Sequence, residues 1–211
     1  WGKSIVARLA DHGVLGPGFV GAHSIWLTDD DLRMPADAGA AVAHNPGSNL
    51  RLGAGIAPVR EMLDRGVAVG LGTDGSVCAD NQNLFEALRI ASVISTVRFP
   101  HETERWLDAD TVWGLATSGS ARVLGQAGDL GAIAPRRKAD LVLLRADSVF
   151  LQPLADPVKA LVYAETGAAV DTVLVDGRVV LERGRVTTVD EDRTYALDVR
   201  VAKNIPIAGR V

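Results

Sequence analysis

The sequence predicts an α/β protein whose strands run parallel in a sheet or barrel. Three short segments of small apolar residues, each typical of a buried strand, alternate with segments typical of amphipathic helices. Repeated strand–helix units of this kind imply parallel strands. Each strand-like segment also ends near a residue able to bind a metal or move a proton, and chemistry in such folds lies at the carboxyl ends of strands.

The predicted strands cover residues 18–24, 40–44 and 67–72. His23, His44 and Asp74 lie at or just beyond their ends. An aspartate directly after the apolar run VAVGLGT is costly to bury unless a positive charge pairs with it. A metal ion, a cationic partner or a catalytic role would supply the reason, and so would a plain helix cap.

The sequence predicts helices at residues 28–39, 55–66, 83–95 and 107–125. Thr28 or Asp29 supplies an N-cap before a first turn rich in acids, which the helix dipole favours. Gly66 is a suitable residue to follow a helix C-terminus. We expect the last segment to break around Gly119 into two helices.

The sequence changes character near Gly128. A β-run at residues 140–145 precedes a predicted hairpin at residues 168–186. Its Asp176–Gly177 pair is preferred in type I′ turns. This all-β part has few residues of catalytic type, and a surface helix is expected at residues 191–205.

Composition narrows the function. The chain has 211 residues, of which 47% are hydrophobic and 23% charged, and its net charge is −4. Without a dense Lys/Arg stripe we expect no nucleic-acid partner, and no apolar run approaches the ~18 residues of a membrane span. A single cysteine, Cys78, excludes an internal disulfide framework and fits the reducing cytoplasm. The chain starts at Trp1 without an initiator Met, so we expect a cut or partial sequence.

The three strand-end residues each have a functional and a structural interpretation. Asp74 is either a metal ligand or acid/base, or an N-cap in the TDG turn, and its apolar lead-in favours function. His23 is equally compatible with a ligand or substrate contact and with a core histidine bonded to a carbonyl. His44 begins HNPGSN, a run of turn formers, so a loop-bracing role is slightly preferred for it.

The stretch AHNPGSNLRLGAGIAPVREMLDRGVAVGLGTDGSVCADNQNLFEALRIAS, at residues 43–92, resembles the amidohydrolase superfamily. It is similar to the branch of methylthioadenosine/S-adenosylhomocysteine deaminases, guanine and 8-oxoguanine deaminases, and triazine hydrolases. The resemblance covers roughly the whole chain. It implies that residues 1–127 are the C-terminal portion of a (β/α)8 barrel, strands six to eight. Residues 128–211 would then be the C-terminal strands of a small flanking β-sandwich, with a terminal helix.

The resemblance also implies roles for the candidate residues. Asp74 would bind zinc and accept a proton from the attacking water, His23 would contact the water or the substrate, and His44 would line or brace the pocket. The implied reaction is the hydrolytic deamination of an aminated purine, pterin or triazine by a zinc-activated water. The implied partners are this small-molecule substrate and, because oligomers are common in the family, further copies of the chain.

One departure from the family pattern matters. The H-x-H of strand one, the strand-five histidine and the glutamate that follows it are not in this sequence, although catalytic zinc usually has three protein ligands. We therefore expect the working enzyme to include an N-terminal portion that carries these residues. The alternatives are a truncated, non-catalytic fragment, a structural or binding subunit, and a hydrolase of cyclic amides.

Overall fold

The computed structural model describes residues 2–190, which form two compact units. The first unit contains residues 2–137 and 146–168, and the second contains residues 138–145 and 169–190. The helix predicted at residues 191–205 lies outside the described residues. The division into domains at residues 1–127 and 128–211 stays a prediction.

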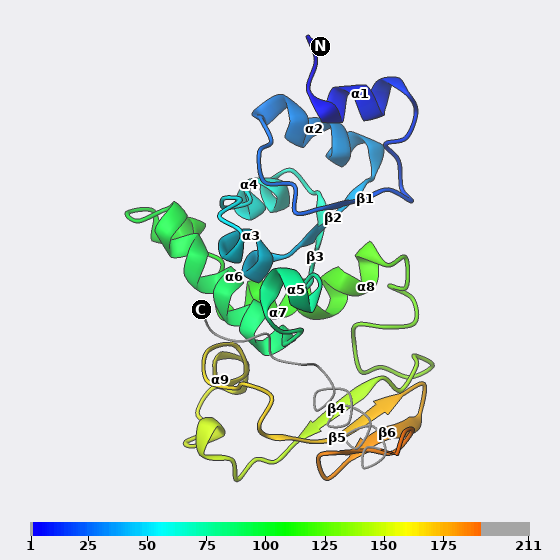
Figure 1. Ribbon diagram of the computed structural model, residues 1–211, viewed down its shortest axis with the longest axis vertical. Helices are drawn as coiled ribbons and strands as arrows, with labels where there is room; N and C mark the ends of the chain where they lie inside the picture. The colour runs from blue at the N-terminus through cyan, green and yellow to red at the C-terminus, as the bar shows by residue number, and fades with distance from the viewer. Residues whose placement is uncertain (1, 191–211) are drawn as a thin grey trace, which may run out of the picture. The chain divides into compact units, whose positions relative to one another are not determined.

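A parallel sheet forms the centre of the first unit (Figure 1). Its strands, in the spatial order β1-β2-β3, are β1 (Val20–Ala22), β2 (Ala41–His44) and β3 (Ala68–Leu71). Each lies within one of the three predicted segments, which confirms the parallel α/β arrangement. The register aligns Ala22, Ala43 and Gly70, so the carboxyl ends of all three strands meet at the same edge of the sheet.

Helices of the first unit connect and cover these strands. They are α1 (Ile5–Asp11), α2 (Asp29–Ala38), α3 (Pro46–Arg51), α4 (Val59–Asp64), α5 (Ser76–Ala79), α6 (Leu84–Arg98), α7 (Ala109–Gly114), α8 (Ser120–Val123) and α9 (Pro157–Tyr163). Shorter helical turns are η1 (Thr103–Arg105), η2 (Leu115–Gly119) and η3 (Val149–Leu151). The buried core lies where the apolar faces of α4, α6 and α7 meet Val42 and Val69 of the sheet.

Local signals account for where the helices begin. Thr28 and Asp31 form a capping box, in which each side chain accepts a hydrogen bond from the other residue's N–H. The Asn83 side chain caps α6 by accepting from the Phe85 N–H. The helix predicted from residue 55 begins only at Val59, because Pro58 disfavours helical backbone in the residue before it.

The break predicted at Gly119 is wrong, because α7, η2 and α8 follow one another as a continuous helical passage with a wide π-helical turn. This passage lies along β3. The Ser120 hydroxyl accepts a hydrogen bond from the Leu71 N–H at 3.1 Å, so it satisfies a backbone group at the edge of the sheet. A Cβ at Gly119 would lie 2.5 Å from the carbonyl oxygen of Val69. Glycine fits at this position because it has no Cβ and the helix lies this close to the strand.

Replacing Gly119 by alanine should lower the free energy of unfolding by about 3 kcal/mol, the upper range for overpacking, because the added methyl group meets backbone atoms that cannot rotate away. Gly114 provides the matched control, since a Cβ there meets nothing within 4 Å and its φ is −58°. Gly114→Ala should leave stability unchanged or raise it by about 0.5–1 kcal/mol. Urea unfolding of both variants measures the difference. Equal stabilities would contradict the close approach of η2 to β3.

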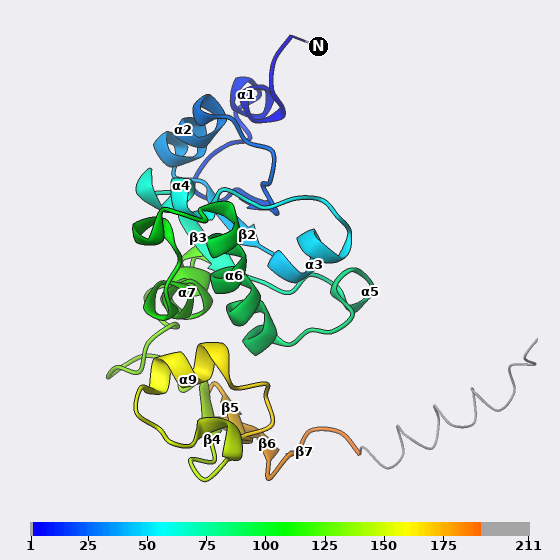
Figure 2. The same ribbon diagram turned by 90° about the vertical axis from the view of Figure 1, so that its left-hand side faces the viewer.

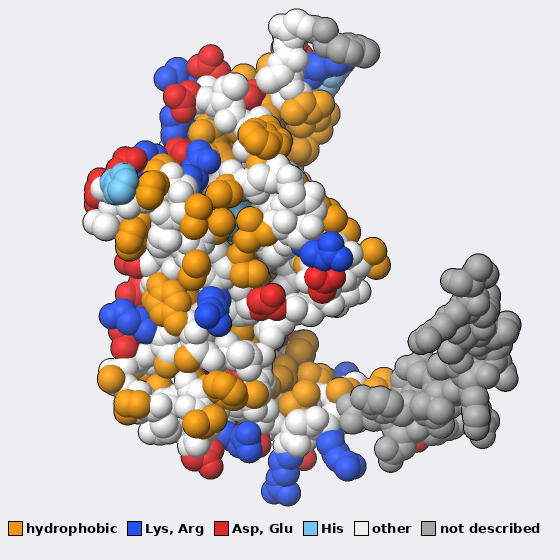
Figure 3. Space-filling view, turned by 60° about the vertical axis from the view of Figure 1, so that its left-hand side comes forward, with side chains coloured by type: hydrophobic (Ala, Val, Ile, Leu, Met, Phe, Trp, Pro, Cys, Tyr) orange, Lys and Arg blue, Asp and Glu red, His pale blue; other side chains and the backbone are white. Residues whose placement is uncertain are grey.

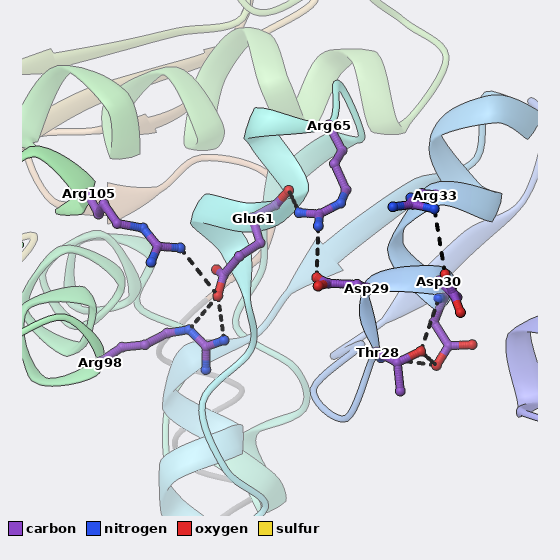
Figure 4. Close-up of polar contacts among 9 residues, drawn as sticks. Thr28, Asp29, Asp30, Arg33, Glu61, Arg65, Arg98 and Arg105 are labelled. Atoms are coloured by element: carbon purple, nitrogen blue, oxygen red, sulfur yellow. Dashed lines mark hydrogen bonds and ion pairs between the residues drawn. The ribbon is translucent and has the colours of Figure 1, made fainter.

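An ion-pair network ties the helices together (Figure 4). Arg98 donates to the Glu61 carboxylate at 2.6 Å, and Arg105 lies 3.8 Å from the same oxygen. Arg65 donates to Asp29 at 2.7 Å and to the carbonyl oxygen of Glu61 at 3.2 Å. The network therefore connects α4 with α2, with α6 and with η1. Because its charged groups pair with one another, the network has a structural role in holding these helices together.

The second unit is an antiparallel sheet in the order β4-β5-β6-β7. Its strands are β4 (Leu141–Leu144), β5 (Val170–Val175), β6 (Arg178–Glu182) and β7 (Arg185–Val186). Asp176 and Gly177 join β5 to β6, and both have positive φ values, of 50° and 76°. A type I′ turn requires positive φ at both positions, so the predicted hairpin is confirmed.

Two features of the described residues concern membrane crossing and surface charge. None of the described helices combines the length and the hydropathy needed to cross a bilayer. On the face drawn in Figure 3, acidic and basic side chains are interspersed with apolar ones. Opposite charges therefore mix on this face.

Candidate active site

Two of the predicted residues lie side by side at the carboxyl edge of the parallel sheet. His23 follows β1 directly, and Asp74 follows β3 after two further residues. Their side chains are 37% and 30% exposed, and His23 Nε2 lies 3.6 Å from Asp74 Oδ2. Residues from the two outer strands of the sheet thus form one polar pair that remains accessible to small molecules.

Both members of the pair have a left-handed backbone. The φ value is 64° at His23 and 63° at Asp74. Such a conformation costs of the order of 1–3 kcal/mol in a non-glycine residue, and it occurs preferentially at functional sites. The His23 N–H donates to the carbonyl oxygen of Ala43 at 3.0 Å, which extends the sheet pairing by one bond. The surrounding structure therefore holds both residues in a strained conformation at the points where their strands end.

Helix α3 braces this pair. Its residues Ser48 and Asn49 are only 1% and 2% exposed. The Ser48 hydroxyl donates to Asp74 Oδ2 at 2.7 Å, and Asn49 Oδ1 lies 2.8 Å from His23 Nδ1. Figure 2 places α3 and α5 next to each other beyond the ends of β2 and β3. Two adjacent residues of one helix therefore each contact a different member of the pair.

Sequence reasoning missed these two residues. It interpreted the HNPGSN stretch as a turn-rich loop, whereas Pro46 begins a helix there. Proline is well suited to the first helical position, where its missing N–H is not needed, and this was the available signal. Nothing local indicated that Ser48 and Asn49 would reach Asp74 and His23.

Hydrogen bonds keep the Asp74 carboxyl group ionised. Two hydrogen bonds lower the pKa of Asp74 below its usual value. The larger effect comes from the Ser48 hydroxyl, and the next from the Gly75 N–H, which lies 2.7 Å from Oδ1. The Cys78 thiol contributes a smaller effect in the same direction. Asp74 is therefore a carboxylate at neutral pH, which is the form that binds a metal ion or accepts a proton.

His44 is placed differently from the other two candidates. Its side chain is 2% exposed, and neither ring nitrogen has a hydrogen-bond partner among the described residues. It lines a small cavity with Ile56, Ala91 and Phe99, between the sheet and helices of the core. Burial, with a smaller contribution from His23, lowers the pKa of His44 to about 4. Its substrate-binding role stays a prediction, since the structure gives it no polar contact with His23 or Asp74.

The donor groups around Asp74 make up only part of what zinc requires. Within residues 2–190, no three His, Cys, Asp or Glu side chains are grouped closely enough to hold a metal ion. The ionised Asp74 carboxylate and the nearby His23 imidazole are both donor types that zinc accepts. They fit one side of a zinc site, and three protein ligands are usual in a catalytic one.

Comparison with known proteins identifies the class. The amidohydrolase family matches residues 3–180, which is most of the chain. The chain therefore belongs to the amidohydrolase family.

Two relatives of the chain are named as deaminases. The chain is 38% identical over 205 residues to 5-methylthioadenosine/S-adenosylhomocysteine deaminase of Acetivibrio thermocellus, covering 97% of this chain and 47% of that protein. It is 38% identical over 208 residues to 5′-deoxyadenosine deaminase of Methanothermobacter thermautotrophicus, covering 99% of this chain and 47% of that protein. The chain spans less than half the length of either relative.

Solved structures show the same likeness. An adenosine deaminase from Xanthomonas campestris with bound zinc superposes with a TM-score of 0.90 at 28% identity, covering 96% of this chain and 46% of that one. The zinc complex of atrazine chlorohydrolase from Arthrobacter aurescens gives a TM-score of 0.89 at 35% identity, covering 95% of this chain and 44% of that one. The described residues thus share the fold of the matching part of these structures, and both of these neighbours contain zinc.

Proposed function

We propose that the chain forms part of a zinc-dependent aminohydrolase that deaminates an aminated N-heterocycle of the purine, pterin or triazine type. The observation that carries the proposal is the pairing of His23 with an ionised Asp74 at the carboxyl edge of a parallel sheet. Catalytic groups of α/β enzymes lie at this edge. The names of the relatives, which specify adenosine derivatives and a chlorinated triazine, support a ring of this kind as the substrate.

In this proposal Asp74 would hold the zinc ion, and His23 would face the water and the substrate. When bound, zinc would acidify a water molecule toward a pKa of about 7. The hydrogen bonds from Ser48 and Gly75 that keep Asp74 ionised also make it a weak base. A weak base accepts a proton more readily from a more acidic donor, so the zinc that Asp74 would hold would favour this proton transfer.

The roles of the two side chains follow from their atoms. Asp74 Oδ2 accepts the proton of the attacking water, and the oxygen of that water then attacks the ring carbon that bears the amino group. His23 Nε2, 3.6 Å from Oδ2, orients the water toward that carbon. Ammonia or an amine leaves, carrying the proton that Asp74 accepted. His44 braces the strand end or lines the pocket.

The finer architecture belongs to the same proposal. Residues 1–127 would form strands six to eight of a (β/α)8 barrel, and residues 128–211 would contribute to a β-sandwich. Further zinc ligands would come from residues outside these 211, because Asp74 alone is too few to hold zinc. We place the enzyme in the cytoplasm, which the free thiol of Cys78 fits, and we propose a homo-oligomer.

An ammonia-release assay tests the proposal. The protein that contains these residues is purified, its intact mass and zinc content are measured, and it is offered aminated purines, pterins and triazines. We expect ammonia from one ring class, with about one zinc per active site. Cleavage of a cyclic amide without ammonia release would support the cyclic-amide alternative. Absence of both zinc and turnover would identify a non-catalytic protein and refute the proposal.

Replacing His23 by alanine should separate its role from metal binding. We expect kcat to fall by about 100-fold or more, which is the usual contribution of a positioned proton-transfer or orienting group. Zinc content should stay close to that of the wild type, since His23 faces the water rather than the metal in this scheme. Steady-state kinetics and metal analysis on the same preparation measure both quantities. Parallel loss of zinc and activity would instead make His23 a metal ligand.

A further inference from the structure

We infer that Asn49 is a positioning residue that holds the His23 imidazole with a proton on Nδ1 and a free lone pair on Nε2. The inference rests on the proposed function only in treating His23 as part of the active site. The contact itself is a feature of the first unit, where Asn49 Oδ1 and His23 Nδ1 lie 2.8 Å apart.

The position of Asn49 is set by its backbone and its surroundings. Its N–H donates to the carbonyl oxygen of Asn45 at 3.0 Å, and its own carbonyl oxygen accepts from the Ala54 N–H at 2.8 Å. The residue is 2% exposed, and its Nδ2 group makes no hydrogen bond to any described residue. The one polar contact of the side chain is therefore directed at His23.

With Asn49 Oδ1 facing Nδ1, this contact favours a proton on that ring nitrogen. An amide oxygen can only accept a hydrogen bond, so the nitrogen facing it must donate. A neutral imidazole has a single N–H, and with that proton on Nδ1 the other nitrogen, Nε2, becomes an acceptor. Free imidazole in water has no such constraint, so removing the amide oxygen removes the preference.

The resulting arrangement creates a position for a donor molecule. His23 Nε2 faces Asp74 Oδ2 at 3.6 Å, beyond hydrogen-bond distance, and both atoms are acceptors. They cannot bond to each other without a shared donor, and a water molecule can donate one hydrogen to each. Ser48 already donates to Oδ2 from the neighbouring position in α3. Helix α3 thus aligns two acceptors on the molecule that would attack the substrate.

Three variants test the inference. Asn49→Leu removes the acceptor but keeps the approximate size of the side chain, and Asn49→Asp keeps an acceptor at the same place. Ser48→Ala is the matched control, because it changes the adjacent residue of α3 and the contact to Asp74 but not the contact to His23. Each is made in the complete enzyme. Nitrogen-15 NMR of the labelled histidines at a pH where the ring is neutral reports the tautomer directly.

We expect His23 to be protonated on Nδ1 in the wild type, in Asn49→Asp and in Ser48→Ala. In Asn49→Leu the proton should redistribute to Nε2, and kcat should fall by about 10- to 100-fold, as is typical for a residue that orients a catalytic group. Asn49→Asp should restore part of this loss. The far-UV CD spectrum should match that of the wild type in all three variants, and zinc content should match it in both Asn49 variants.

Two results would overturn the inference. One is an Nε2-protonated His23 in the wild type, and the other is an unchanged tautomer in Asn49→Leu. The proposed function fails independently, because the NMR measurement needs no turnover. A tautomer that depends on Asn49 in a protein without hydrolase activity would support the positioning role and refute the aminohydrolase.

Discussion

Asp74→Asn should reduce deaminase turnover at least about 1,000-fold, because it removes both the proton acceptor and the anionic metal ligand. Zinc content should fall in the same variant. The fold should survive, since asparagine has nearly the same size and tolerates the left-handed backbone, at φ 63°, better than most residues. Ser48 can still donate to an amide oxygen at this position. Steady-state kinetics and metal analysis of the complete enzyme measure the effect.

Asp80 offers a matched control for this experiment. It also has a positive φ, of 64°, and its carboxylate pairs with Arg51 at 2.8 Å on the surface. An exposed pair of this kind contributes at most about 1 kcal/mol, so Asp80→Asn should change turnover by no more than about two-fold. Near-normal turnover in Asp74→Asn, or equal losses in the two variants, would refute the assignment of Asp74.

Acid should destabilise the protein through His44 at a pH where carboxylates are still ionised. Burial lowers the pKa of His44 from 6.5 to about 4 in the folded state. The unfolded chain therefore binds a proton first as the pH falls below about 6.5, and the folded state binds it only near pH 4. Stability is lost across this interval by about 1.4 kcal/mol per pH unit, for a total of about 3 kcal/mol.

Replacing His44 by leucine should remove this acid sensitivity. The cavity around it is lined mainly by apolar side chains, and its ring nitrogens have no hydrogen-bond partner among the described residues, so an apolar residue of similar volume loses no polar contact. The free energy of unfolding, measured with urea, should fall between pH 7 and pH 5 by about 2 kcal/mol less in His44→Leu than in the wild type. His101 is exposed, and His101→Gln should retain the wild-type difference. Identical pH dependence in all three proteins would show that His44 is not a buried, neutral histidine.

Much of the local structure was predictable because it depends on neighbouring residues. Small apolar runs specified the strands, Thr28 and Asn83 capped their helices, and the Asp176–Gly177 pair specified the hairpin turn. The positions of His23 and Asp74 followed from parallel topology, which brings the carboxyl ends of strands to one edge. These features involve contacts within a few residues or a general property of the fold.

The remaining features depend on contacts between distant segments. At Gly119 the helical passage lies close against β3. A glycine that permits such a close approach looks the same in sequence as one that ends a helix.

Contacts between distant segments also decided the roles of His44, Ser48 and Asn49 in the HNPGSN stretch. By itself the sequence determined that polar residues occur there. The tertiary structure turned His44 into the apolar core, where a charge is costly, and brought Ser48 and Asn49 within hydrogen-bond distance of Asp74 and His23. The physical reason is that strand register and the start of α3 determine which side chains face the site. A shift of one residue would turn the strand side chains to the opposite face and rotate those of the helix away from the site.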